Sequence, residues 1–173
     1  MPELPRRRQL ADAAITVLAR TGMRGLTHRA VDAEAALPAG STSNHFRTRR
    51  ALTIGVVDRL AERDLDDLAL TETRPGAAAD LMSMWTHTDP DRFRARVEIT
   101  VEATRDPEIA RILAEGRARI IDFVEQARQG APPETHRALA LTSSQLVALL
   151  AGLQWAEYTT GEELIAPVLG RLA

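Results

Sequence analysis

The chain of 173 residues is 45% hydrophobic and only 3% aromatic, which suits one ordinary domain, or a small head joined to a larger body, with an aliphatic core. It contains no cysteine, which excludes disulfides, cysteine-ligated metals and a thiol nucleophile, and no apolar run approaches the roughly 20 residues of a membrane span, so we expect a cytoplasmic protein. The formal net charge is −2, but residues 1–50 carry nine arginines against four acidic residues and the remainder carries 13 against 20, so a basic head precedes an acidic body.

The first predicted element is a helix from about Leu4 to Thr21. Alanine and leucine, the strongest helix formers, are abundant along the whole chain, and no segment shows the alternation of a strand. Gly22 follows this helix and offers the left-handed residue that closes many helices. We therefore expect an all-α fold of about nine helices.

Two short helices are predicted next. Thr27 is a good N-cap for the first of them, which must end before Pro38. The second is predicted from Pro38 or Ala39 to His45, because proline suits the first position of a helix. Phe46 is expected to pack inward just beyond it.

A long amphipathic helix from about 49 to 71 is predicted to link the head to the body, since leucines and valines recur along it at helical spacing. Proline-containing breaks divide the rest of the chain. Between these breaks we expect helices at about 77–88, 91–104, 107–129, 134–159 and 162–172. The head is therefore assigned to residues 1–50, with the two short helices forming a motif at about 26–45, and the body to residues 51–173.

The predicted helix at 134–159 is apolar on nearly all sides, and such a helix must be covered on all sides. We expect a second copy of the chain to supply part of this cover, because small residues in the helix allow close approach and the C-terminal helix adds another apolar stripe. The other interpretation is a central core helix within a monomer. The residues predicted at the dimer interface are Leu139, Leu146, Leu149, Leu150, Gly152, Leu153, Leu164 and Val168.

The two short helices of the basic head fit a helix-turn-helix, in which the first helix braces the second against the major groove of DNA. The second carries short polar side chains that can approach base edges and phosphates, and arginines follow it where phosphates would pass. A generic helical corner with a solvated basic face is the other interpretation. The predicted DNA-binding residues are Thr27, Arg29, Ala39, Gly40, Ser41, Thr42, Ser43, Asn44, His45, Arg47, Arg49 and Arg50.

The stretch THRAVDAEAALPAGSTSNHFRTRRAL, residues 27–52, resembles the DNA-reading segment of the TetR family of repressors. The residues at matching or conservative positions are Thr27, Val31, Ala35, Leu37, Gly40, Ser41, His45, Phe46, Thr48, Arg49 and Leu52. Three departures stand out: Ala36 replaces the turn glycine, Pro38 replaces the serine that caps the recognition helix, and Ser43 replaces a tyrosine. Asp32 stands in place of a small residue, and we expect it to face solvent.

The resemblance implies a one-component transcriptional regulator, a repressor that binds palindromic, double-stranded operator DNA as a homodimer and is released by a small-molecule effector. The alternative is a helical ligand-binding or dimerisation module without operator-specific DNA binding. An apolar effector would be held by the few bulky side chains of the body, each of which could instead be plain core. The predicted ligand-binding residues are Met82, Trp85, Phe93, Val97, Thr100, Phe123, Trp155 and Tyr158.

No pattern in the chain predicts catalysis. The four histidines are dispersed, and there is neither a glycine-rich phosphate loop nor a nucleophile elbow. His87, Asp89 and Asp91 are the only group that suggests a metal, and capping of the loop before Pro90 explains them better. We therefore expect no enzymatic activity, no cofactor and no metal.

Overall fold

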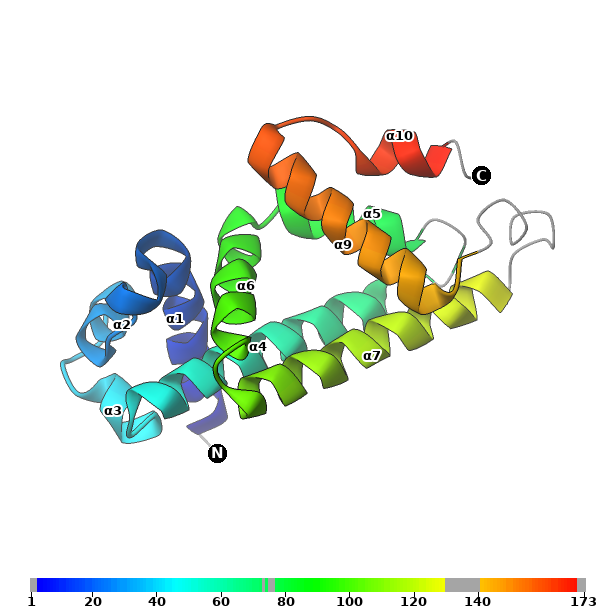
Figure 1. Cartoon of the computed structure of the whole chain (residues 1–173). Coiled ribbons are helices and arrows are strands. Elements are labelled where there is room, and N and C mark those ends of the chain that lie inside the picture. Colours follow the sequence, from blue (N-terminus) through cyan, green and yellow to red (C-terminus); the bar gives the residue numbers. More distant parts are fainter. Residues whose placement is uncertain (1–2, 73, 75–76, 130–140, 171–173) are drawn as a thin grey trace. The chain divides into compact units, whose positions relative to one another are not determined.

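The computed structural model of the chain describes residues 3–72, 74, 77–129 and 141–170 (Figure 1). These residues contain helices and no strand, which confirms the predicted all-α fold. The helices are α1 Glu3–Gly25, α2 His28–Glu34, α3 Ser41–His45, α4 Arg49–Leu70, α5 Ala77–His87, α6 Pro90–Ala103, α7 Pro107–Gln129, α9 Ser143–Thr160 and α10 Ile165–Gly170. Among the described helices, none has the length and apolar character needed to cross a bilayer.

The chain forms two compact units. The first unit contains Met1–Asp64 and Pro90–Ala114, and the second contains Leu65–Asp89 and Glu115–Ala173. Helices α4 and α7 therefore each contribute one part to the first unit and another to the second. The predicted boundary at residue 50 does not coincide with this division, so the division into head and body remains a prediction about function.

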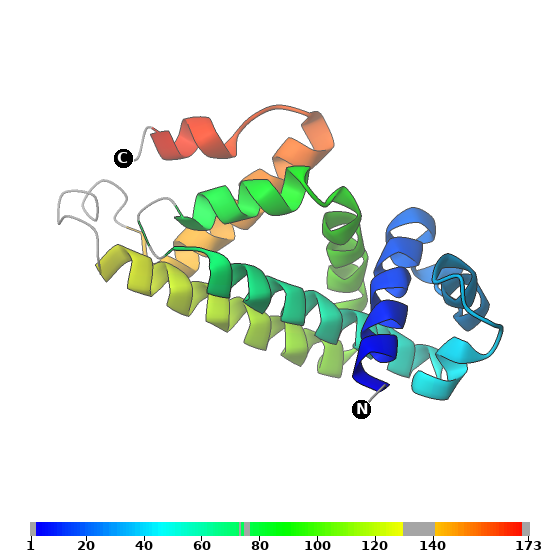
Figure 2. The ribbon, with the colours of Figure 1, turned by 180° about the vertical axis from the view of Figure 1, so that it is seen from behind.

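The core of the first unit includes residues of α1 and α6, which run side by side in both views (Figures 1 and 2), and of α4. Leu10, Ala14 and Leu18 follow the helical spacing along α1 and are completely buried. Burial of one such leucine contributes about 1.5–3 kcal/mol to stability. The full core consists of Leu10, Ala11, Ala14, Ile15, Val17, Leu18, Leu26, Val31, Phe46, Leu52, Val56, Val57, Leu60, Ala95, Ile99 and Ile109.

Gly22 has the predicted left-handed conformation, with φ +66°, but α1 resumes after this kink and continues to Gly25. Phe46 is 1% exposed, which confirms that it packs inward. Its ring lies directly on Gly55 of α4, where a Cβ atom would come within 2.2 Å of the ring carbon Cε1. The absence of a side chain at this position of α4 is therefore what makes room for the aromatic ring beneath α3.

The second unit is held together by contacts among α5, α9 and α10. Its buried core consists of Leu81, Met82, Trp85, Val124, Val147, Leu150 and Ile165. Trp85 donates from Nε1 to Asp67 Oδ2 at 2.7 Å, and Gln154 donates from Nε2 to the carbonyl oxygen of Met82 at 3.1 Å. These two bonds satisfy polar atoms that the apolar core would otherwise leave without partners.

Helix α9 begins after a capping box, in which Thr142 and Gln145 each bond the backbone amide of the other. The predicted start at residue 134 lies outside the described residues. One side of α9 is buried, whereas Leu149 is 37% exposed and Trp155 is 49% exposed. The small residues Ala148, Ala151 and Gly152 are exposed as well. Within one chain, α9 is therefore covered on one side only.

Candidate nucleic-acid interface

Helix α2 is anchored at its first residues. The hydroxyl of Thr27 accepts a hydrogen bond from the Ala30 amide at 3.2 Å, which confirms Thr27 as the N-cap. His28 donates from Nε2 to the carbonyl oxygen of Phe46 at 2.5 Å, and Val31 is completely buried. The first residue of α2 is thus bonded to the residue that follows α3, and this bond holds the two short helices together.

The turn between α2 and α3 ends later than predicted. Ala36 has φ +53°, the left-handed conformation that glycine adopts at lower cost. Helix α3 begins at Ser41, so the predicted start at Pro38 or Ala39 is wrong. Pro38 lies in the turn, where its carbonyl oxygen accepts from the Ser41 amide at 3.1 Å. The N-cap is Gly40, with φ +94°, which has no side chain to cap the helix.

The missing cap is supplied by Asp32 of α2. Its Oδ2 accepts from the Gly40 amide at 2.8 Å, and its Oδ1 accepts from the amide and the hydroxyl of Thr42 at 2.7 and 2.5 Å. Asp32 is 4% exposed and Thr42 is completely buried. The predictions that Asp32 faces solvent and that Thr42 contacts DNA are therefore wrong, because each side chain is bonded to the other inside the first unit.

Sequence reasoning missed Asp32 as a functional residue, although one signal was present. None of Pro38, Ala39 and Gly40 has a side-chain acceptor, so the first amides of α3 had to find one elsewhere. Burial alone would raise the pKa of Asp32, but the hydrogen bonds from Thr42 and Gly40, helped by the nearby His28, outweigh burial and hold the pKa below its usual 3.8. The carboxylate is therefore ionised at neutral pH.

The outer side of α3 carries the remaining polar residues. Ser41 and Ser43 donate their hydroxyls to backbone carbonyl oxygens three residues earlier, at 2.7 and 2.9 Å. Asn44 is exposed, and its side chain has no hydrogen-bond partner within the described residues. His45 is half-buried at the end of the helix. Asn44 is thus the side chain of α3 whose donors and acceptor are all available to an outside molecule.

The predicted arginines divide into two groups. Arg49 donates to the carbonyl oxygen of Met23, and Arg50 bonds both carboxylate oxygens of Asp106 at 3.0 Å and pairs with Glu108 at 2.8 Å. The hydrogen bonds that Arg50 donates to Asp106 and Glu108 raise the pKa of Arg50 above its usual value. Both arginines are exposed, but in this structure each holds parts of the first unit together.

Arg29 on α2 and Arg47 after α3 differ from this group. Both are exposed, and neither forms an ion pair or hydrogen bond with any other described residue. They flank the outer side of α3 in the sequence, on either side of Asn44. The structure therefore leaves two cations and one amide of residues 27–52 without partners among the described residues, together with the lone pairs of the two serine hydroxyls.

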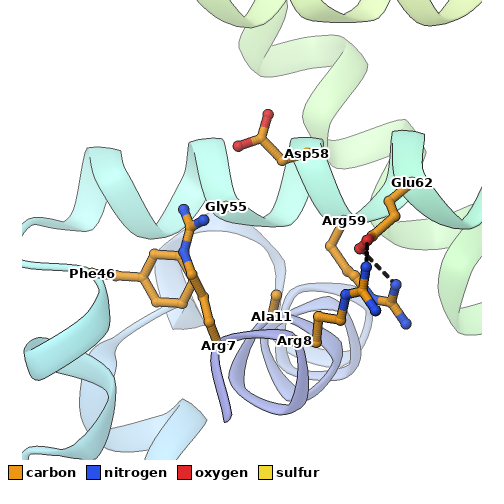
Figure 3. A pocket seen from close by; sticks show the side chains of 8 residues that line it. All are labelled: Arg7, Arg8, Ala11, Phe46, Gly55, Asp58, Arg59 and Glu62. Carbon is orange, nitrogen blue, oxygen red and sulfur yellow. Dashed lines mark hydrogen bonds and ion pairs between the residues drawn. The ribbon is translucent and has the colours of Figure 1, made fainter. Parts of the chain in front are cut away.

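An open cavity of about 290 Å³ lies between the first turns of α1 and the middle of α4 (Figure 3). The guanidinium of Arg7 lies 5.0 Å from the centre of the Phe46 ring, a cation–π distance. Arg8 and Arg59 both bond Glu62, as the dashed lines show. The lining residues are Arg7, Arg8, Ala11, Phe46, Gly55, Asp58, Arg59 and Glu62. No predicted ligand-binding residue lines this cavity.

The predicted ligand-binding residues are divided between the two units. Phe93, Val97 and Thr100 belong to the first unit, where Phe93 is buried and Thr100 is exposed. The others belong to the second unit: Met82 and Trp85 lie in its core, Phe123 and Tyr158 are half-buried, and Trp155 is half exposed. Their role in ligand binding remains a prediction.

The predicted dimer-interface residues also differ in exposure. Leu150 is 1% exposed within its own chain, so its assignment to the interface is wrong. Leu149 and Gly152 are exposed, Leu146, Leu153, Leu164 and Val168 are half-buried, and Leu139 lies outside the described residues. Among the described residues, no group of three or more histidines and acids is arranged as a metal site.

Residues 72–173 match the family model described as tetracyclin repressor-like, C-terminal domain. A search of curated proteins found no match. Solved structures, in contrast, are similar over almost the whole chain. A member of the TetR family from Streptomyces coelicolor A3 is 28% identical, with a TM-score of 0.75, over 99% of this chain and 98% of that one.

The multidrug binding protein EbrR, solved with imidazole, is also 28% identical, with a TM-score of 0.69, over 99% of this chain and 90% of that one. Other structures of EbrR contain malachite green and ethidium. A transcriptional regulator from Rhodococcus sp. Rha1 shares the fold, with a TM-score of 0.77 and 21% identity over 96% of this chain and 93% of that one.

Proposed function

Because the chain belongs to the TetR family of transcriptional regulators, whose C-terminal domain it carries over residues 72–173, we propose that α2 and α3 bind operator DNA and that the body binds a small-molecule effector. One observation supports the DNA-binding part above all others. Asn44 of α3, Arg29 of α2 and Arg47 after α3 are all exposed and have no partner among the described residues.

In this proposal α3 is the recognition helix. Asn44 can bond the N6 and N7 atoms of an adenine in the major groove at the same time, and the serine hydroxyls can accept or donate at neighbouring bases or phosphates. Arg29 and Arg47 neutralise phosphates. We expect Arg49 and Arg50 to contact phosphates less readily than Arg29 and Arg47, because their internal bonds must be weakened before they can reach DNA. Thr27, Ala39, Gly40 and His45 remain proposed contacts of the turn and the helix end.

We further propose that two copies of the chain meet through the exposed side of α9. Leu149 and Trp155 leave apolar area in water, and a Cβ atom added at Gly152 would meet no atom within 4 Å, so a partner helix could approach closely. A symmetric dimer would set two recognition helices about one DNA turn, or about 34–36 Å, apart. Such a dimer reads a palindromic operator in two successive major grooves.

The proposed effector is an apolar small molecule, and the structures of EbrR with malachite green and ethidium favour one that contains aromatic rings. The eight predicted ligand-binding residues remain the candidates for its site. Helix α4 contributes to both units, with Leu52 in the core of the first and Leu68 packed against the core of the second. It is therefore the proposed route from ligand to DNA. The effector would release DNA only if it binds more tightly to the conformation that does not bind the operator. In this proposal the protein acts as a repressor and has no enzymatic activity.

The proposal is tested by electrophoretic mobility with the DNA that flanks the protein's own gene. We expect a salt-sensitive and sequence-selective shift. Asn44→Ala should lose about 1–3 kcal/mol of discrimination between the operator and a variant with one adenine changed. Gln126→Ala, which removes an exposed amide from α7, is the matched control and should not change the shift.

Arg47→Ala should weaken binding to all DNA sequences similarly and reduce the salt dependence by about one phosphate contact. Arg117→Ala on α7 removes the same charge elsewhere and should change neither. A protein that shifts no DNA selectively would be the ligand-binding or dimerisation module without operator binding, and the proposed function would then be wrong.

A further inference from the structure

The recognition helix of this chain, α3, does not stabilise its first turn by itself. It has five residues, and a helix of this length is unstable by itself because nucleation costs more than so few hydrogen bonds return. Its first amides need acceptors from outside the helix. Gly40 at the N-cap has no side chain, and the hydroxyls of Ser41 and Ser43 act as donors to carbonyl oxygens. Local sequence therefore provides no cap.

Asp32 replaces that cap from the neighbouring helix. The three hydrogen bonds that it accepts occupy both carboxylate oxygens, with Gly40 on one and Thr42 on the other. All three donors belong to the first residues of α3 or to its N-cap. An ionised carboxylate offers only acceptors, and a negative charge is favourable at the positive end of a helix. The contact thus fixes the position of α3 relative to α2.

The same carboxylate has an electrostatic cost for DNA binding. The first 50 residues depend on arginines to attract phosphates, and a negative charge beneath the recognition helix opposes this attraction. A neutral residue in its place would favour binding to any DNA sequence. The charge favours operator binding only if the gain from an ordered recognition helix exceeds the loss of electrostatic attraction to the phosphates.

We propose that Asp32 is the positioning residue of the recognition helix, which gives up part of the non-specific affinity for DNA in exchange for sequence selectivity. The inference rests on the proposed DNA binding by α3, but the contact itself can be tested without DNA. It assigns to Thr42 the role of partner to Asp32 and not of a reader of bases.

Asp32→Asn is the most informative substitution, because it keeps the shape and removes the charge. The amide of asparagine carries a donor where one carboxylate oxygen was, so it cannot accept from Gly40 and Thr42 together. Glu34→Gln is the matched control, since Glu34 is an acid on the same helix that is exposed and bonds Arg20 at 3.4 Å instead of α3. Both variants raise the charge of the head equally.

The first experiment measures amide hydrogen exchange by NMR on the full chain without DNA. In Asp32→Asn we expect the amides of Gly40 and Thr42 to exchange at least about tenfold faster, because hydrogen bonds to charged groups are stronger than those to neutral ones. In Glu34→Gln both amides should exchange at the wild-type rate. Unchanged exchange in Asp32→Asn would overturn the inference.

The second experiment compares binding to the operator with binding to unrelated DNA of the same length at several salt concentrations. Asp32→Asn should lose at least about tenfold in operator affinity while its affinity for unrelated DNA stays equal or rises. Glu34→Gln should change both affinities in the same direction and leave their ratio constant. An Asp32→Asn protein that behaves like Glu34→Gln would show that Asp32 acts through charge alone and would overturn the inference.

A second pair of variants tests the inference in case the Asp32→Asn protein is too unstable to study. Thr42→Val keeps the shape of the buried side chain but removes its hydroxyl, whereas Thr42→Ser keeps the hydroxyl. We expect the valine variant to lose selectivity and the serine variant to restore most of it. Equal selectivity in both would count against the inference. If wild-type protein binds no DNA selectively, the proposed function fails, and the exchange rates of Gly40 and Thr42 still decide whether Asp32 orders α3.

Discussion

Helices α3 and α9 present opposite kinds of residues to solvent. The exposed side of α3 is polar, and its one buried side chain, that of Thr42, is bonded to Asp32. In α9 the exposed side carries Leu149 and Trp155, while several buried positions are polar. Those buried polar side chains belong to Ser143, Gln154 and Glu157. A rule that places apolar residues in the interior and polar residues at the surface would be wrong at these residues of both helices.

In both helices the bonding partners available to a side chain, and not its polarity alone, determine whether it is buried. Gln154 bonds the carbonyl oxygen of Met82, and Glu157 accepts from the amides of Leu164 and Ile165 at 2.6 and 2.7 Å. These bonds satisfy Gln154 and the Oε1 atom of Glu157 in the interior, whereas the buried Oε2 atom of Glu157 has no hydrogen-bond partner among the described residues. Asn44 on α3 is exposed without a hydrogen-bond partner among the described residues, and Leu149 and Trp155 on α9 leave apolar area in water, which is why we propose DNA for one helix and a second chain for the other.

The largest expected effect is at Phe46, beneath α3. Phe46→Ala should lower the free energy of unfolding by about 3–5 kcal/mol, because it removes a fully buried ring and leaves a cavity above Gly55. Urea unfolding of the two proteins measures this difference. Trp155→Ala, studied at protein concentrations where any dimer has dissociated, should cost much less because Trp155 is half exposed. Equal losses would mean that the exposures assigned to these two rings are wrong.

An intermediate effect is expected at Trp155 when two chains associate. If α9 forms the dimer interface, Trp155→Ala should weaken association by about 2 kcal/mol, as large aromatic residues at interface centres commonly do. Sedimentation equilibrium over a range of protein concentrations gives the dissociation constants. Gln126→Ala on α7 serves as the control with unchanged association. A wild-type protein that is monomeric at all concentrations would disprove the proposed dimer.

The smallest effect is the pH dependence that Asp32 contributes. Because its pKa is lower in the folded protein than the usual 3.8, the unfolded chain takes up the proton more readily. Asp32 therefore adds stability above about its unfolded pKa, and this contribution disappears as the pH falls through the lower, folded value. Besides the hydrogen bonds from Thr42 and Gly40, the neighbouring His28 contributes to the lower pKa of Asp32 through its electrostatic attraction.

This pH dependence is measured as the difference in unfolding free energy between wild type and Asp32→Asn from neutral pH into the acid range. The difference removes the contributions of other shifted acids, such as Glu62 and Asp106, which both proteins share. We expect the advantage of wild type to shrink as the pH falls. A constant difference over the whole acid range would contradict the role of the carboxylate charge.

Most helices could be predicted because their signals are local. The helix predicted at 107–129 matches α7 at both ends, and the linking helix predicted at 49–71 differs from α4 by one residue. Apolar residues at helical spacing and the proline-containing breaks carry this information without reference to distant parts of the chain. The left-handed Gly22 and the N-cap Thr27 were found for the same reason.

The errors all concern residues whose partners are distant or whose environment depends on packing. Pro38 suits the first position of a helix, but the bonds to Asp32 move the start of α3 to Ser41. Leu150 looks the same as its neighbour Leu149 in the sequence, yet one faces the core of its own chain and the other faces outward.

The amino-acid pattern alone was enough to predict that this chain is helical, where most of its helices lie and which segment resembles a helix-turn-helix motif, because helix formation depends on neighbours within a few residues. Which side chains of that segment remain available depended on how the helices pack. Asp32 and Thr42 are ten residues apart, and Arg50 and Asp106 are 56 apart, so their bonds form only once the helices have packed. Burial and pairing are properties of the folded unit, and they separate the groups that maintain the fold from those that can bind a partner.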